Sequence, residues 1–291
     1  MNGPTCAPAL EVLYAGSLDD LVREELFPRF EDLAGYRCAG RAGGSREWAR
    51  QLRLGQVEAD LLLSADSSVN ELELMRPGGA VAEWYLTFAT NELVLGYSRA
   101  SPAFPEMEAM ARTEDGWLRL LRSGLRLGRP DPELDPKGYR TLFALQLAES
   151  QFGLTGLAAE VAGGPRNPQQ LFPADALMPM LERGELDLVF CYRSQAEETG
   201  IPYLPLPEHV NLGSPEMAEV YSGASYRCQD GTTYLGAPIA YTATPLVCAR
   251  HPVASAALLV FLASSEGAEC VRLHGFRPAR ALVRPGLARH D

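Results

Sequence analysis

Residues 84–97 read WYLTFATNELVLGY, an apolar stretch that could form one unusually long extended segment. A second stretch of this kind, GAPIAYTATPLV, occupies residues 236–247. Short apolar strands alternate with helical patterns before the first stretch and between the two, which is typical of an α/β fold. Two long strands on either side of an inserted α/β segment predict a chain that crosses twice between two lobes. The alternative is a single large, doubly wound sheet.

The shorter elements also indicate an α/β fold. Strands are expected at residues 11–15, 36–42 and 60–64, and the last is almost wholly apolar, as in strands buried on both faces of a parallel sheet. Pro28 should kink the helix that follows the first strand. Later in the chain, the pattern predicts a helix at 139–152, a helix at about 174–181, a strand at 186–192 and one strongly apolar helix at about 253–273.

The composition excludes several classes of function. Of the 291 residues, 46% are apolar and 22% are charged, which is enough apolar surface for a sizeable core. The formal net charge of −11 would repel phosphate backbones, so we expect no nucleic-acid partner. Because no apolar run approaches the roughly 18–20 residues needed to cross a bilayer, we also expect no membrane span.

The sequence carries few patterns typical of metal or catalytic sites. Its six cysteines contain no C-x-x-C pair, and its four histidines lack the spacing of metal ligands. We find no G-x-S-x-G, G-x-G-x-x-G, P-loop or H-E-x-x-H motif. The missing signatures favour a binding protein without a cofactor over an enzyme. The first residues show neither a basic nor an apolar stretch, so no signal peptide is visible in the sequence.

Small polar residues stand at three predicted helix starts. Ser17 and Ser45 each follow glycine, and Asp135 precedes Pro136, which suits the first helical position. The unpaired N–H groups and the dipole of a helix start together make an anion site. Because the two serines follow successive parallel strands, we expect them at the same edge of the sheet. The alternative role for each residue is simple N-capping, worth about 1 kcal/mol.

Several stretches, taken in order along the chain, resemble one protein family. They are YAGSL (14–18), AGGS (42–45), ADLLLSAD (59–66), the segment at 84–97, DPKGYRTLFALQLAE (135–149), LERGELDLVFCYRSQA (181–196) and LPEHVNLGSP (206–215). From about residue 11 to about residue 280, the chain resembles the archaeal-type tungstate/molybdate-binding proteins of ABC transporters.

The resemblance implies a type II periplasmic-binding-protein-like α/β fold. In this fold, two α/β lobes are joined by two crossover strands and the ligand lies in the cleft. The borders expected for this chain put lobe I at residues 9–87 and 241–291 and lobe II at residues 88–240. The two long apolar stretches fall where such a fold needs its hinges.

The resemblance also implies a set of ligand-binding residues drawn from both lobes: Gly16, Ser17, Ser45, Asp135, Pro136, Lys137 through its N–H, and Tyr192. A carboxylate next to an oxyanion is repelled unless it is protonated or bonds the metal centre itself. The family uses the second option, so Asp135 is expected to bond the molybdenum or tungsten of the ion. Lys137 would be the only basic side chain at this site, and a solvated first-turn lysine is the simpler expectation for it.

One position departs from the family pattern. The family has a glutamate that also bonds the metal centre, and its position falls on Ala174 in this sequence, with Asp175 beside it. Asp175 could substitute for that glutamate, although its shorter side chain would point about 100° away on a helix. Without this substitution, Asp135 would bind the metal alone, or the preferred anion would differ.

These observations predict an extracytoplasmic solute-binding protein that captures tungstate or molybdate and delivers it to an ABC permease. We expect a monomer that performs no chemistry on its ligand and whose lobes close about residues 86–92 and 238–244. Residues 1–8 would be a disordered segment that remains after removal of a leader. Three alternatives remain: an oxyanion sensor, a binder of sulfate or ferric ion, and an enzyme on the same architecture, for which the sequence offers no nucleophile or acid–base pair.

Overall fold

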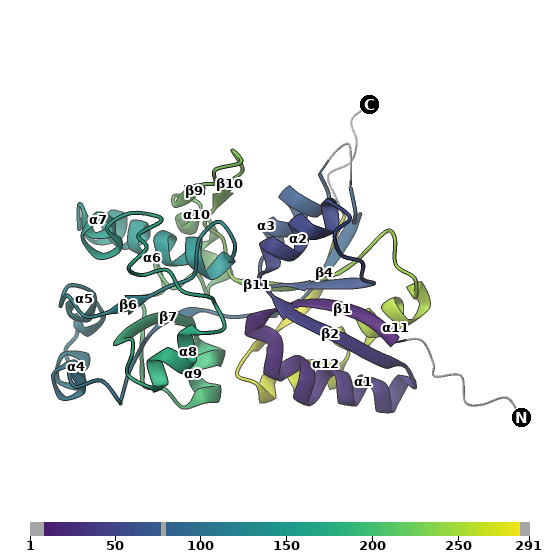
Figure 1. The fold of residues 1–291 in the computed structure, drawn as a ribbon, viewed down its shortest axis with the longest axis horizontal. Coiled ribbons are helices and arrows are strands. Elements are labelled where there is room, and N and C mark those ends of the chain that lie inside the picture. The colour runs from purple at the N-terminus through teal and green to yellow at the C-terminus, as the bar shows by residue number, and fades with distance from the viewer. Residues whose placement is uncertain (1–8, 77–79, 286–291) are drawn as a thin grey trace, which may run out of the picture. The chain divides into compact units, whose positions relative to one another are not determined.

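The computed structural model describes residues 9–76 and 80–285, with the backbone alone for residues 280–285. The N-terminal segment expected at residues 1–8 lies outside the described residues. Figure 1 shows the chain from its N-terminus to its C-terminus, with the helices and strands labelled as they are named below.

The chain divides into two compact units, with borders between Ala89 and Thr90 and between Ile239 and Ala240. Unit 1 combines the N-terminal and C-terminal parts of the chain, and unit 2 is the segment between them (Figure 1). The chain therefore passes twice from one unit to the other. The expected borders, after residues 87 and 240, lie within two residues of the observed ones.

Unit 1 is built on a six-stranded sheet. Its strands are β1 (Ala9–Ala15), β2 (Arg37–Gly43), β3 (Leu61–Ser64), β4 (Trp84–Thr90), β11 (Ala240–Pro245) and β12 (Arg277–Pro285). They lie in the order β12-β4-β11-β3-β1-β2. β1 pairs in parallel with β2 and β3, whereas β11 pairs antiparallel with β3. All four residues of β3 are buried, as its apolar sequence predicts.

The helical segments of unit 1 differ from the prediction at Pro28. They are a 3₁₀ turn (Gly16–Leu18), a π-helical segment (Leu21–Leu26), α1 (Phe27–Ala34), α2 (Ser45–Arg53), α3 (Ser67–Val69), a second π-helical segment (Asn70–Leu74), α11 (Pro252–Leu262) and α12 (Ser265–Leu273). The sequence predicts one kinked helix, but a π-helical segment directly precedes α1. Leu26 has helical dihedral angles (φ −64°, ψ −50°), so the two segments join without a break and Pro28 lies within one continuous helical run. A proline inside a helix removes one backbone hydrogen bond, and π-helical turns commonly accompany such interruptions.

The apolar helix predicted at about 253–273 is in fact two helices. α11 ends at Leu262, and the hydroxyl of Ser264 accepts a hydrogen bond from the N–H of Gly267 (3.2 Å), which starts α12. The two helices are bent by 69° at this break. No single helix among the described residues is long and apolar enough to cross a membrane, although α11 and α12 together pass that test of length and composition.

Unit 2 is built on its own four-stranded sheet, with the order β6-β7-β5-β8. The strands are β5 (Leu93–Tyr97), β6 (Leu127–Gly128), β7 (Leu188–Tyr192) and β8 (Tyr203–Pro205). β5 pairs antiparallel with β7 and β8, and β6 pairs in parallel with β7. Every residue of β5 and β7 is buried, so these two strands form the centre of the unit. Two separate sheets rule out the single doubly wound sheet.

Most of unit 2 outside the sheet is helical. Its remaining elements are α4 (Phe104–Ala111), α5 (Gly116–Leu121), α6 (Pro136–Phe152), α7 (Leu157–Ala162), α8 (Leu177–Glu182), α9 (Arg193–Thr199), a 3₁₀ turn (Pro215–Met217), α10 (Ala218–Tyr221), and the hairpin strands β9 (Ser225–Arg227) and β10 (Thr233–Leu235). The helix predicted at 139–152 is α6, which begins at Pro136, and the helix predicted at about 174–181 is α8, which begins only at Leu177.

The stretch at residues 84–97 is not one extended segment. It forms β4 in the sheet of unit 1 and β5 in the sheet of unit 2, with Asn91 and Glu92 between them. The side chain of Asn91 explains the break, because its Oδ1 accepts from the N–H of Glu92 (2.9 Å) and its Nδ2 donates to Oγ of Ser194 (2.8 Å). In the second long stretch, only Ala240–Pro245 is a strand.

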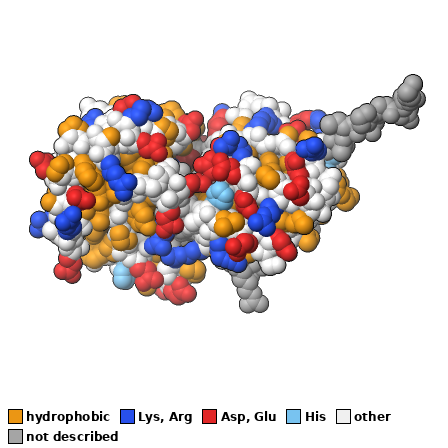
Figure 2. Space-filling model, turned by 90° about the horizontal axis from the view of Figure 1, so that it is seen from below, with side chains coloured by type: hydrophobic (Ala, Val, Ile, Leu, Met, Phe, Trp, Pro, Cys, Tyr) orange, Lys and Arg blue, Asp and Glu red, His pale blue; other side chains and the backbone are white. Residues whose placement is uncertain are grey.

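Many exposed charges are paired with a neighbour. On the face shown in Figure 2, acidic and basic side chains are interspersed. Pairs one helical turn apart include Arg23 with Asp19 (3.2 Å) and Arg29 with Glu25 (2.9 Å). Exposed pairs of this kind contribute only about 0.3–0.5 kcal/mol each. The apolar core, rather than these pairs, therefore stabilises each unit.

Candidate functional site

The two serines of unit 1 follow neighbouring strands that end at the same level. In the parallel pair β1–β2, Ala15 lies opposite Gly43, so the turn with Ser17 and the turn with Ser45 leave the sheet at one edge. Gly43 has no room for a side chain, because a Cβ there would lie 2.6 Å from the ring of Trp48. The sequence therefore brings Ser17 and Ser45 to one edge, as their pattern predicts.

Neither serine caps its helix. Ser45 is the first residue of α2, and its buried Oγ accepts from the N–H of Ala65 (3.0 Å). Ser17 lies within the 3₁₀ turn, and its Oγ lies 3.2 Å from the hydroxyl oxygen of Tyr241. The N-capping alternative is therefore wrong for both residues. Gly16, the other predicted ligand residue in this unit, is exposed.

Asp135 does cap its helix. Its Oδ1 accepts from the N–H of Lys137 (2.8 Å), and Pro136 occupies the first turn of α6. The N–H of Lys137, predicted to reach the ligand, thus donates to Asp135 in this structure. A carboxylate has a second oxygen, so the cap leaves Oδ2 of Asp135 for another role.

Lys137 is buried, contrary to the expectation of a solvated first-turn lysine. Its side chain is 2% exposed, because the start of α6 packs inside unit 2. Its Nζ donates to Oε1 of Gln195 (3.2 Å) and lies 5.7 Å from the centre of the Tyr192 ring. Burial lowers the pKa of Lys137, an effect that the nearby Asp135 carboxylate partly offsets. Lys137 is also the only lysine in the sequence.

Tyr192 is the last residue of β7, and its side chain is buried. It has a basic neighbour, Arg140, that the sequence analysis did not identify. Nη1 of Arg140 donates to the hydroxyl oxygen of Tyr192 (2.7 Å), and Arg140 is itself only 2% exposed. Lys137 is therefore not the only basic side chain here. The spacing of three residues, which puts Lys137 and Arg140 on one face of a helix, was the signal that could have revealed the pair.

Asp175 does not lie on a helix, although the sequence analysis placed it on one. It is exposed and belongs to the turn at residues 174–176 that precedes α8, so it is not on a helix. The argument that its side chain would point about 100° away on a helix is therefore wrong. Whether Asp175 replaces the family glutamate stays a prediction.

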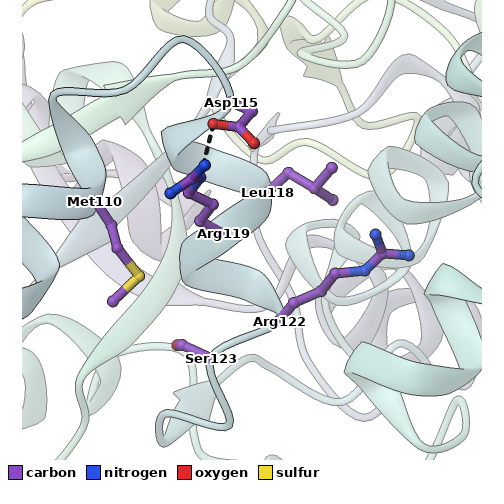
Figure 3. A pocket seen from close by; sticks show the side chains of 6 residues that line it. All are labelled: Met110, Asp115, Leu118, Arg119, Arg122 and Ser123. Carbon is purple, nitrogen blue, oxygen red and sulfur yellow. Dashed lines mark hydrogen bonds and ion pairs between the residues drawn. The ribbon is translucent and has the colours of Figure 1, made fainter.

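Two cavities in unit 2 are lined by other residues. One of about 370 Å³ lies beside α5 and is lined by Met110, Asp115, Leu118, Arg119, Arg122 and Ser123 (Figure 3). Among these lining residues, Nε of Arg119 donates to Oδ1 of Asp115 (2.8 Å). The other, of about 530 Å³, includes Arg122, which pairs with Glu160 (3.1 Å). None of the predicted ligand residues lines either cavity, and these charged side chains already have partners.

Within the described ranges, no group of three histidine, cysteine, aspartate or glutamate residues lies close enough to hold a metal ion. Five of the six cysteines are described, and all five are free thiols. The sixth, Cys6, lies outside the described residues.

The model of one protein family, the bacterial extracellular solute-binding proteins, matches residues 10–277. The chain belongs to this family. It is therefore a solute-binding protein of the extracytoplasmic space and not an enzyme, which confirms what the missing catalytic signatures predict.

Named relatives confirm the resemblance to molybdate- and tungstate-binding proteins. A Haloferax volcanii protein, provisionally named an ABC transporter molybdenum-binding protein, is 36% identical over 238 residues, which cover 82% of this chain and 72% of the relative. The molybdate/tungstate-binding protein WtpA of Pyrococcus abyssi is 29% identical over 252 residues, which cover 79% of this chain and 72% of WtpA.

Solved structures confirm the periplasmic-binding-protein-like fold. The periplasmic molybdate-binding protein of Azotobacter vinelandii matches with a TM-score of 0.60 at 16% identity, over 92% of this chain and 98% of that one. The sulfate-binding protein SubI of Mycobacterium tuberculosis matches with a TM-score of 0.62 at 15% identity, over 94% and 87%. At these identities the likeness concerns the fold alone.

Proposed function

We propose that this protein captures molybdate or tungstate outside the cytoplasm and delivers it to the permease of an ABC transporter. The proposal is supported by the chemical groups that the predicted ligand-binding residues and their neighbours carry. Unit 1 offers the hydroxyls of Ser17 and Ser45, and unit 2 offers the hydroxyl of Tyr192 beside two buried cations. The names of the relatives from Haloferax volcanii and Pyrococcus abyssi support the choice of ion.

Hydroxyl donors and buried cations suit a tetrahedral dianion. Each oxygen of such an ion accepts hydrogen bonds, and hydrogen bonds to charged groups contribute about 1.5–3 kcal/mol each. Lys137 and Arg140 carry together the charge that a dianion needs, and both are at least nine-tenths buried, where charges interact more strongly than in water. We propose that Ser17, Ser45 and Tyr192 donate to one ion and that these two cations balance its charge.

Asp135 decides between molybdate and sulfate in this proposal. Its Oδ1 caps α6, so we propose that its Oδ2 bonds the metal centre as a hard oxygen ligand. Molybdenum and tungsten can accept a further oxygen ligand, whereas the sulfur of sulfate cannot. Sulfate remains the second candidate, because the hydroxyls and cations alone fit any tetrahedral dianion.

Calorimetric titration with tungstate, molybdate, sulfate and phosphate tests this function. We expect tight binding of tungstate or molybdate, weaker binding of sulfate, and a rise in unfolding free energy of roughly 2.7 kcal/mol at about 100 times the dissociation constant. If none of the four ions binds or raises the melting temperature, the proposed function is wrong.

Asp135→Asn is the matched variant, since asparagine caps helices as well as aspartate does but offers no carboxylate. We expect this variant to fold normally and to lose about tenfold or more of the preference for molybdate over sulfate. An unchanged preference would show that the carboxylate does not bond the metal centre and would favour sulfate-type recognition.

A further inference from the structure

The hairpin β9–β10 carries two tyrosines on one face. Tyr226 and Tyr234 lie directly opposite each other in its antiparallel register, and both side chains are buried. The ring of Tyr234 stacks on that of Tyr139 in α6, with the ring centres 4.7 Å apart and the planes at 12°. Further along α6, the side-chain amide of Gln146 exchanges two hydrogen bonds with the backbone of Ser225 (2.9 and 3.1 Å). The hairpin is therefore fixed on α6 at two points (Figure 1).

The other tyrosine of this face holds a carboxylate in the loop that leads to α6. The hydroxyl of Tyr226 donates to Oε1 of Glu133 at 2.5 Å, and the N–H of Gln229 in the hairpin turn donates to Oε2 (3.2 Å). Burial and the neighbouring carboxylate raise the pKa of Tyr226, so its phenol keeps the proton that it donates. Hydrogen bonds to ionised acceptors are roughly twice as strong as those between neutral groups. The hairpin therefore joins α6 firmly to the loop that precedes it.

This loop is a chain of short turns, so the position of Glu133 affects that of Asp135. Oδ1 of Asp131 accepts from the N–H of Glu133 (2.8 Å), and the carbonyl oxygen of Asp131 accepts from the N–H of Asp135 (3.1 Å). At the start of the loop, the buried guanidinium of Arg129 donates to two backbone carbonyl oxygens at residues 164–165 (2.7 and 2.8 Å). Both ends of the loop are thus tied to other segments of unit 2, and the hairpin holds the end next to Asp135.

From these contacts we propose that the hairpin β9–β10 is a positioning element for the ligand site, with Tyr226 as its positioning residue. Through Glu133 it fixes the carboxylate of Asp135, and so favours oxyanions whose central atom can bond that carboxylate. A bond to a metal centre tolerates errors of only about 0.2 Å, whereas hydrogen bonds form over a wider range of distances. Loosening the loop should therefore weaken the binding of molybdate more than that of sulfate. The inference rests on the proposed function in one respect, that Asp135 bonds the metal centre.

Tyr226→Phe tests this role, because it removes one hydroxyl and keeps the ring. We expect the molybdate-to-sulfate affinity ratio, measured by calorimetry, to fall about tenfold, the lower end of the losses caused by removing the support of a metal ligand. Glu133→Ala should also lower the ratio, whereas Glu133→Gln keeps an acceptor oxygen for Tyr226 and should retain most of it. Tyr85→Phe is the matched control, since Tyr85 in unit 1 donates to Glu71 at the same distance of 2.5 Å. Its ratio should stay at the parent value.

A double variant separates this inference from the proposed function. If the hairpin acts through Asp135, adding Tyr226→Phe to Asp135→Asn should leave the ratio of Asp135→Asn unchanged. A parent-like ratio in Tyr226→Phe, an equal fall in Tyr85→Phe, or a further fall in the double variant would overturn this inference alone. A ratio that Asp135→Asn itself leaves at the parent value would overturn the proposed bond to the metal centre, and this inference with it.

Discussion

The burial of Lys137 is the feature that most distinguishes the candidate site from an ordinary solvent-exposed surface. The sequence has 26 basic residues, and its single lysine is buried beside Tyr192 and Gln195. Burying an ammonium group costs free energy unless something compensates for it. We therefore propose that this cation is retained for an anionic ligand rather than for stability.

Replacing Lys137 with methionine should separate these two effects. The side chains are similar in length, so we expect the ligand-free Lys137→Met protein to melt at or above the temperature of the parent. We expect its affinity for molybdate to fall roughly 10- to 100-fold, because a charged hydrogen-bond donor is lost. Thermal unfolding and calorimetry measure the two quantities. A clearly lower melting temperature with unchanged affinity would contradict this account.

The lowered pKa of Lys137 also predicts how stability depends on pH. Between that pKa and the value of about 10.4 in the unfolded chain, the unfolded chain binds a proton that the folded chain has lost. The free energy of unfolding contributed by Lys137 should therefore rise with pH across this window. Urea unfolding of the parent, with the same series on Lys137→Met subtracted, isolates the contribution. A difference that falls as pH rises would disagree with the burial of the ammonium group.

The sequence could single out candidate site residues but not their surroundings. The resemblance picks out Tyr192 and Lys137. The spacing of Arg140 puts it on the same helix face as Lys137, but a spacing does not say that this face is buried. Burial depends on how α6 packs against β7, which is a property of the folded unit. The same limit explains why Lys137 was expected to be solvated.

At the scale of elements, Ser45 links the start of α2 to the chain that follows β3. Its hydroxyl accepts from the N–H of Ala65, and both atoms are buried. Ser17 differs, because it is half-buried and its hydroxyl lies against another hydroxyl, that of Tyr241. The two serines therefore have different structural roles but the same proposed role in ligand binding.

Substituting each serine by alanine should reveal this difference. Ser45→Ala leaves a buried N–H without an acceptor and should cost about 1–3 kcal/mol of unfolding free energy, whereas Ser17→Ala should cost less than about 1 kcal/mol. Both variants should bind molybdate more weakly than the parent. Urea unfolding gives the first comparison and calorimetry the second. Equal destabilisation by the two substitutions would contradict the role assigned to Ser45.

Element boundaries were predictable where local chemistry decides them. Gly35 ends α1 with a positive φ of 72°, a conformation that glycine commonly adopts just after a helix. Two breaks, one in a predicted helix and one in a predicted strand, were not predicted, because the apolar pattern continues across the few polar residues that cause them. The break before α12 follows from the capping hydroxyl of Ser264, and the break between β4 and β5 follows from the side-chain hydrogen bonds of Asn91.

At the scale of the whole molecule, the order of elements was enough to predict the fold class and the two passages of the chain between units. Both passages lie in the long apolar stretches at 84–97 and 236–247: in the first the chain leaves the sheet of unit 1, and in the second it returns to that sheet. The ligand is less predictable, since hydroxyls and buried cations serve any tetrahedral dianion. Among the proposed site residues, only the carboxylate of Asp135 favours a metal-centred ion, and this preference is a proposal about one bond.

A crystal structure of the protein with tungstate tests the central claim most directly, because the anomalous scattering of tungsten locates the metal independently of the protein. We predict one tungsten site, with a bond to the carboxylate of Asp135 and with hydrogen bonds to the ion from Ser17, Ser45 and Tyr192. A tungsten atom bound elsewhere, or bound by the residues of one unit only, would contradict the account.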